Sequence, residues 1–175
     1  MVKYFFALLL FIFTTQVTVA QSLFDKYTEP ESGTVIYKGE ISLNELLNEP
    51  SFTWMDSMKT YKSDSNAVTF LKKYMNRYQL LIFLGTWCED SHHLIPQLYK
   101  IISASEFPLA QTKLYGVDRN KEGKYLEGKI YNITKVPTII VSNGPKEIGR
   151  ITETVKVSLE QDLIDIILSD SDFKE

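Results

Sequence analysis

The stretch LLIFLGTWCEDSHH, Leu80 to His93, decides the fold of this chain and holds its only cysteine, Cys88. The first half of the stretch is a continuous apolar run of strand length, which is typical of a strand buried on both faces of a sheet. Beyond Cys88, apolar residues recur at helical spacing, at Leu94, Leu98, Ile101 and Ile102. The sequence therefore predicts that Cys88 stands where a central strand turns into a helix.

Strand and helix patterns alternate on both sides of this stretch. A helix pattern precedes it from Asp64 to Tyr78, behind the capping residues SDSN. Strand patterns follow at 113–118, 138–144 and 147–154, and helix patterns follow at 125–131 and from Ser158 onward. Asn143-Gly144-Pro145 predicts a hairpin between the last two strands. The resulting order, β-α-β-α-β-β-α, predicts an α/β fold.

The first 20 residues have the pattern of a signal peptide. One cation, Lys3, precedes an apolar run from Tyr4 to Phe13, and the small residues Thr18 and Ala20 follow. We expect cleavage between Ala20 and Gln21, which would make the protein exported, periplasmic or extracellular. A transmembrane anchor is the alternative, although the run is shorter than the roughly 20 residues that a bilayer requires.

After cleavage the chain would hold about 155 residues, which suits one domain with an extension. Removal of Lys3 leaves 18 basic and 22 acidic side chains, a net charge of −4 without long blocks of one sign. This balance argues against binding to nucleic acid or to an anionic membrane. We interpret residues 21–63 as an N-terminal extension, with a strand at Val35–Tyr37 and a short helix behind the capping box Ser42–Glu45.

A cysteine at the start of a helix has a specific chemistry. Backbone N–H groups and the helix dipole favour its thiolate, which is the nucleophilic form. Ser91 returns a hydroxyl to the same turn and can donate a hydrogen bond to the sulfur. His92 lies at i+4 on the same helical face, where its protonated ring would also favour the thiolate. Glu89 and Asp90 are anions in the same turn and oppose this effect.

Two other interpretations of these residues stay open. Cys88 can be one more buried apolar side chain, as free cysteines often are. A cysteine and a histidine at i and i+4 can also bind a metal, but His92 and His93 point about 100° apart on a helix. We therefore expect no metal site and take one of the two histidines as a surface residue.

The segment TWCEDSHHLIP resembles the active-site segment of the thioredoxin family, in which a tryptophan precedes Cys-x-x-Cys and a proline follows five residues later. Trp87 and Cys88 match that segment, Ser91 stands in place of the second cysteine, and Pro96 has the spacing of the helix-kinking proline. A second segment, KVPTIIV, resembles the Ile-Pro-Thr segment of the same family. This resemblance implies that Pro137 is a cis-proline facing Cys88 and that Val136 precedes it at the substrate-binding surface.

The resemblance extends over residues 64–170 and implies a thioredoxin-like domain at 64–175, with a central mixed β-sheet flanked by helices. The chain departs from the family at Ile82, where thioredoxins carry a buried aspartate, and at Ser91, which leaves no second thiol. The second thiol normally resolves the mixed disulfide. Without it, release requires a thiol of the client protein, a low-molecular-weight thiol or another redox protein.

Two functions follow from these residues. The first is an exported thiol-disulfide oxidoreductase or isomerase with Cys88 as its nucleophile, assisted by Ser91 and His92, with Trp87, Val136 and Pro137 binding the client. The second is a non-catalytic module that binds client peptides beside Pro137. Neither implies a cofactor, and both imply thiol- or disulfide-containing partners. The alkylation rate of Cys88 distinguishes the two, because an accessible thiolate reacts fast near neutral pH.

Overall fold

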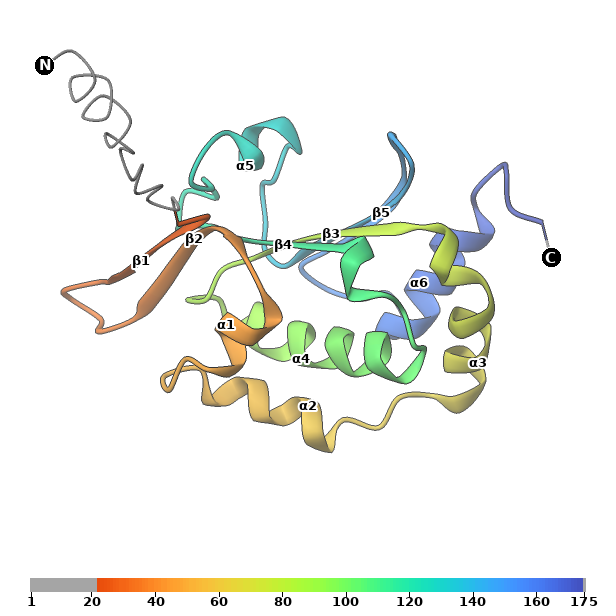
Figure 1. The fold of residues 1–175 in the computed structure, drawn as a ribbon, viewed down its shortest axis with the longest axis horizontal. Coiled ribbons are helices and arrows are strands. Elements are labelled where there is room, and N and C mark those ends of the chain that lie inside the picture. Colours follow the sequence, from red (N-terminus) through yellow and green to blue (C-terminus); the bar gives the residue numbers. More distant parts are fainter. Residues whose placement is uncertain (1–21, 175) are drawn as a thin grey trace, which may run out of the picture.

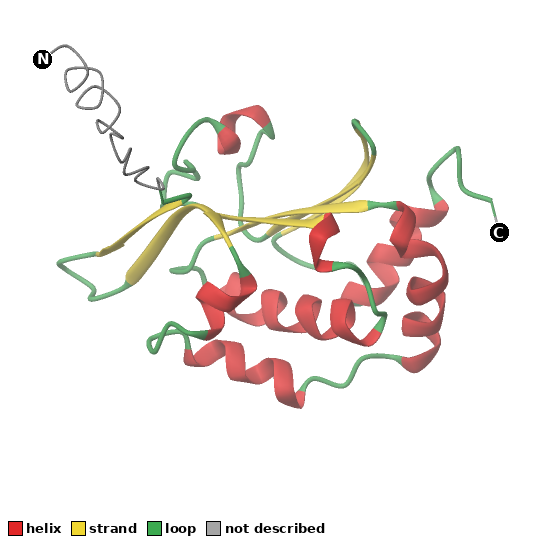
Figure 2. Cartoon of the chain, viewed as in Figure 1, coloured by secondary structure: helices red, strands yellow, loops and turns green. Residues whose placement is uncertain are grey.

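The computed structural model describes residues 22–174, which form an α/β protein with one mixed six-stranded sheet flanked by helices (Figure 2). The strand order across the sheet is β1-β2-β4-β3-β5-β6. The pairing of β3 with β4 is parallel, and the other four pairings are antiparallel. Among the described residues, no helix is long and apolar enough to cross a membrane. The predicted signal peptide, residues 1–20, lies outside the described part of the chain.

The strands of the sheet are β1 Phe24–Thr28, β2 Val35–Ile41, β3 Gln79–Leu84, β4 Thr112–Gly116, β5 Thr138–Asn143 and β6 Lys146–Thr152. The α-helices are α1 Leu43–Leu47, α2 Ser57–Thr60, α3 Ser65–Tyr74, α4 Glu89–Ala104, α5 Glu127–Ile130 and α6 Leu159–Leu168. Short 3₁₀ turns are η1 Thr53–Asp56, η2 Met75–Arg77 and η3 Leu109–Gln111.

The predicted alternation from residue 64 onward is confirmed, and β3 is the buried strand that the apolar run predicted. It lies between β4 and β5, and four of its residues, Leu80, Ile82, Phe83 and Leu84, are fully buried. The hairpin of β5 and β6 forms at Asn143-Gly144-Pro145. Ser158 caps α6 by accepting a hydrogen bond from the Gln161 N–H, and Ser42 and Glu45 form the predicted capping box of α1.

Residues 22–63, which the sequence sets apart as an extension, continue the same sheet. The strand β2 pairs with β4 over Gly39 to Ile41, and β1 pairs with β2 along its whole length. The strand β1 was not predicted, because FDKYT has no apolar alternation and four of its five residues are exposed. Backbone pairing to β2, rather than burial of side chains, therefore holds β1 in place.

The two faces of the sheet are covered unequally. Helices α1, α2, α3, α4 and α6 lie on one side, and α5 lies on the other (Figure 1). The larger apolar core is on the helix-rich side and contains Leu80, Ile82 and Leu84 of β3. A smaller cluster includes Phe83 and Val136, and the half-buried side chains of Trp87 and Cys88 pack against it. The turn that carries Cys88 is therefore anchored to this smaller cluster.

Candidate functional site

Cys88 is the N-cap residue of α4, so it stands directly between β3 and the helix, as predicted. Its backbone N–H donates to the Gly85 carbonyl at 2.9 Å, which closes the turn after β3. Its half-buried thiol donates to the Val136 carbonyl oxygen, with 3.3 Å between Sγ and O. The Val136–Pro137 peptide bond is cis, as the resemblance implied. The structure thus brings Cys88, Val136 and Pro137 together, although 48 residues separate Cys88 from Val136.

Ser91 lies in the first turn of α4 and binds the backbone of the turn before it. Its side chain is fully buried, and its Oγ accepts a hydrogen bond from the Gly85 N–H at 3.2 Å. Among the described residues, no hydrogen bond joins Ser91 to Cys88. The hydroxyl of Ser91 therefore binds the backbone, and not the sulfur as the sequence suggested. Through this contact, Ser91 stabilises the turn between β3 and Cys88.

His92 also contacts the backbone of the turn. Its Nε2 lies 2.8 Å from the Thr86 carbonyl oxygen, and its ring stacks on Trp54 of η1, with centroids 4.6 Å apart and planes at 14°. No hydrogen bond between the His92 ring and the Cys88 sulfur is present in the described part of the chain. His93 points elsewhere, is exposed, and pairs with Gln97 at 3.0 Å. His93 is thus the surface histidine that the helical geometry predicted.

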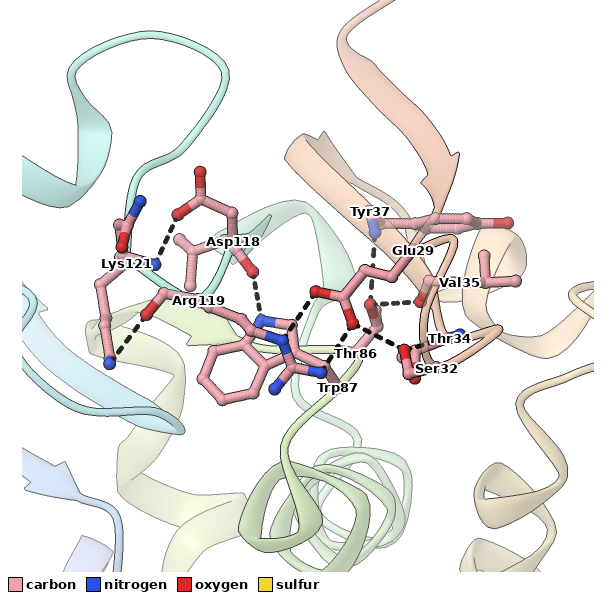
Figure 3. A network of polar contacts seen from close by, with 12 residues as sticks. Glu29, Ser32, Thr34, Val35, Tyr37, Thr86, Trp87, Asp118, Arg119 and Lys121 are labelled. Atoms are coloured by element: carbon pink, nitrogen blue, oxygen red, sulfur yellow. Dashed lines mark hydrogen bonds and ion pairs between the residues drawn. The ribbon is translucent and has the colours of Figure 1, made fainter.

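Trp87 is held both by its indole N–H and by the face of its ring. Its Nε1–H donates to the Val117 carbonyl oxygen at 2.9 Å. The Arg119 guanidinium lies 5.1 Å from its ring centroid and the Lys121 ammonium 5.6 Å away, both within cation–π range. Arg119 and Lys121 lie in the loop after β4, which Figure 3 shows beside the β1–β2 hairpin. Glu29 of the hairpin accepts two hydrogen bonds from Arg119, each 2.7 Å long. The hydrogen bonds from Arg119 lower the pKa of Glu29 to about 2.

Thr86 ties the turn to β2. Its buried side-chain hydroxyl donates to the Val35 carbonyl oxygen at 2.8 Å and accepts from the Tyr37 N–H at 3.2 Å (Figure 3). A second link joins Lys38 of β2 to Asp118 at 2.6 Å. The N-terminal strands therefore bind both the loop after β3, which carries Trp87 and Cys88, and the loop after β4, whose Val117 carbonyl accepts from Trp87.

A groove of about 340 Å³ opens beside the first turn of α4. Asp90 and His93 line one side, and the segment after β6 lines the other. Leu94, Val155 and Leu159 contribute apolar surface. The groove reaches the cis-proline segment through Glu153, whose N–H donates to the Pro137 carbonyl oxygen at 2.7 Å. A chain segment bound there would contact the first turn of α4 and the segment after β6.

In residues 22–174, no group of three or more His, Cys, Asp or Glu side chains is arranged to hold a metal ion. The charged side chains around Cys88 are instead paired with one another or directed to solvent. Lys135 pairs with Glu153, and Asp90 is exposed and unpaired within the described residues.

Several residues of the site were not predicted from the sequence, namely Glu29, Trp54, Thr86 and Arg119. Glu29, Trp54 and Arg119 lie far from the WCEDS segment in the sequence, and their contacts depend on strand pairing or on packing of distant segments. Thr86 carried a signal, because a polar side chain between a buried strand and a helix must find partners if it is buried. Trp54 carried a weaker one, since it is one of only two tryptophans in the chain.

Comparison with known proteins yields structural likeness alone. Neither a scan against family models nor a search of curated proteins finds a match. A crystal structure of a protein of unknown function from Pseudomonas aeruginosa is similar, with a TM-score of 0.53 and 13% identity over 74% of this chain and 91% of that one. An HIV epitope-scaffold protein is also similar, with a TM-score of 0.46 and 14% identity over 74% and 89% of the chains. The first likeness supports the α/β architecture and carries no function.

Proposed function

We propose that this chain is an exported thiol-disulfide oxidoreductase or isomerase of thioredoxin-like fold, with Cys88 as its only nucleophile. The observation that carries the proposal is the position of the Cys88 sulfur, at the N-terminus of α4 and 3.3 Å from the Val136 carbonyl oxygen. The helix supplies N–H groups and a dipole that favour a thiolate. The adjacent Val136–Pro137 segment offers backbone next to the sulfur, where an extended client can align.

The reaction is a thiol-disulfide exchange. Cys88 first loses its proton to solvent, and its thiolate attacks one sulfur of a client disulfide. The client S–S bond breaks as the bond to Cys88 forms, and the other client sulfur leaves as a thiolate. A second thiol, from the client or from a low-molecular-weight thiol, then attacks the mixed disulfide and restores the Cys88 thiolate. Attack by the client's own thiol leaves the number of disulfides unchanged, which is isomerisation.

Two observations favour a second function, a module that binds clients without turnover. The Cys88 S–H donates to the Val136 carbonyl oxygen, a contact that only the protonated thiol makes. The first turn of α4 also carries two exposed carboxylates, Glu89 and Asp90, which repel a thiolate. In such a module, the groove beside α4 would hold the client and the thiol would remain inert.

Alkylation with iodoacetamide at neutral pH separates the two functions, because the chain has no other cysteine. We expect Cys88 to react at least as fast as a free cysteine peptide, and to form a mixed disulfide with a model peptide disulfide. Cys88→Ser should abolish both products, since an alcohol is too weak an acid to replace the thiol. A folded protein whose thiol stays unmodified would instead support the binding module.

A further inference from the structure

Trp54 contributes to the site through the face of its ring. It lies in η1, 34 positions before Cys88 in the chain, and stacks on His92 with centroids 4.6 Å apart and planes at 14°. Its indole N–H is buried and has no acceptor among the residues that the structure describes. A buried donor without a partner costs free energy. The role of Trp54 at this position is therefore aromatic contact and not hydrogen bonding.

The hydrogen bond to Thr86 determines which nitrogen of His92 carries a proton. The Nε2 atom lies 2.8 Å from the Thr86 carbonyl oxygen, and a carbonyl oxygen can only accept a hydrogen bond. Nε2 must therefore be the donor, and the neutral ring is the Nε2–H tautomer. With Trp54 against its face, the ring is held in the orientation that this hydrogen bond requires.

Thr86, whose carbonyl binds His92, is also held through its side chain. The Thr86 hydroxyl binds β2 through the Val35 carbonyl and the Tyr37 N–H. The Thr86 carbonyl accepts a hydrogen bond from His92. The turn that contains Thr86 is closed by the hydrogen bond from the Cys88 N–H to the Gly85 carbonyl. The backbone from which the Cys88 side chain projects is thus held on two sides by the N-terminal segment.

We propose that Trp54 is a positioning residue of the Cys88 site, which acts by locking His92 onto the Thr86 carbonyl. This inference rests on the proposed function, and it assigns residues 22–63 a part in that function. It also gives His92 a different role from the one the sequence predicted: His92 positions the turn and does not act on the sulfur. A peptide disulfide must align its backbone and sulfur with Cys88, so its reaction depends on this geometry. A small alkylating reagent has no such requirement.

The first test measures the tautomer of His92 from ¹⁵N spectra of its imidazole ring. The spectra are recorded in a His93→Gln background, which leaves one histidine. At a pH where the ring is neutral, we expect Nε2 alone to be protonated. Trp54→Leu should give a mixture of both tautomers. Trp54→Phe should keep the Nε2–H form, because it retains an aromatic face and loses no hydrogen bond. Phe70→Leu, which removes a half-buried aromatic ring from α3, is the matched control and should change nothing.

The second test compares two reactions of Cys88. Trp54→Leu should slow mixed-disulfide formation with a peptide disulfide about tenfold, and change the iodoacetamide rate by less than about twofold. His92→Phe keeps a stacked ring but removes the donor to Thr86, and should reproduce the slower peptide reaction. If Trp54→Leu does not fold, the unaltered protein and His92→Phe still test the contact of His92 with Thr86, without which Trp54 has no positioning role.

The proposal is overturned if neutral His92 in the unaltered protein is the Nδ1–H tautomer, or if His92→Phe leaves the peptide reaction unchanged. An unreactive Cys88 in the unaltered protein contradicts the proposed function instead. In that case the tautomer measurement still reports whether Trp54 holds His92 on Thr86. The two failures are thereby distinguishable.

Discussion

On one side of Cys88, the turn of Gly85, Thr86 and Trp87 is bound to β2, to the loop after β4 and to His92, which stacks on Trp54 of η1. On the other side, in the described residues, the Cys88 side chain makes a single hydrogen bond, to the Val136 carbonyl oxygen. The first side buries its polar groups against partners. On the second side, Glu153 donates its N–H to the Pro137 carbonyl oxygen and lines a groove of about 340 Å³. The difference indicates that the N-terminal side fixes the backbone of the turn that carries Cys88. Under the proposed function, the Pro137 side is where the client binds.

The contacts on the N-terminal side also have the geometry of strong interactions. The Thr86 hydroxyl both donates and accepts within a buried site, and the Arg119–Glu29 pair is bidentate. On the Pro137 side, the ion pair joins the exposed Lys135 to the half-buried Glu153 at the surface, so it contributes little to stability. Substitutions on the first side should therefore cost stability, and substitutions on the second should affect client binding.

Removal of the Thr86 hydroxyl should have the largest effect on stability. Thr86→Val keeps the shape of the side chain but leaves the buried Tyr37 N–H and the Val35 carbonyl without their partner. We expect the free energy of unfolding, measured by urea denaturation, to fall by about 1–3 kcal/mol. Thr69→Val on the exposed face of α3 is the control and should change it by less than about 0.5 kcal/mol. Equal effects at the two positions would contradict the view that β2 holds the turn.

Ser91→Ala separates a contact with the backbone from a contact with the sulfur. Because Ser91 accepts from the buried Gly85 N–H, its loss should lower the free energy of unfolding by about 1 kcal/mol. The iodoacetamide rate of Cys88 should stay within about twofold, because a small reagent does not depend on the alignment of the turn. A loss of tenfold or more in that rate, at unchanged stability, would place Ser91 in the chemistry after all.

Local patterns predicted most of the fold, because the relevant forces act over a few residues. The buried strand, the caps at Ser42 and Ser158 and the Asn143-Gly144-Pro145 hairpin each depend on near neighbours in the sequence. The placement of Pro137 beside Cys88 was implied by a resemblance and not by any local rule. The strand β1 was missed because it is held by backbone pairing, which leaves no apolar signature.

The contacts of the candidate site were less predictable than its position. Helical spacing placed Ser91 and His92 near Cys88 but did not show that both would bind the backbone of the turn. Those orientations depend on Gly85 and on Trp54, which stacks on His92 from the segment that the sequence set apart as an extension. Partners brought together by strand pairing or by packing of distant segments cannot be deduced from the spacing of residues within one helix.

On the Pro137 side, Lys135→Ala should cost less than about 1 kcal/mol of stability, because both partners of its ion pair with Glu153 are near the solvent. Its effect should appear in client binding, since Glu153 would become an unpaired anion at the edge of the groove. We expect tighter binding of a cationic peptide and weaker binding of an anionic one, measured by fluorescence polarisation at low salt. Lys129→Ala, on α5, is a matched exposed control and should leave both affinities unchanged.

The smallest effect should come from acid acting on Glu29. Its hydrogen bonds with Arg119 lower its pKa to about 2, against about 4.3 in an unfolded chain. A lowered pKa means that the pair stabilises the fold above pH 4.3 and that this contribution is lost as the pH falls towards 2. Arg119 would then release its contact with the β1–β2 hairpin above Trp87. We expect Trp87 fluorescence, recorded in a Trp54→Phe background, to change over that range before global unfolding. Glu29→Gln, which cannot titrate, should lose that transition, and an identical transition in this variant would show that another carboxylate causes it.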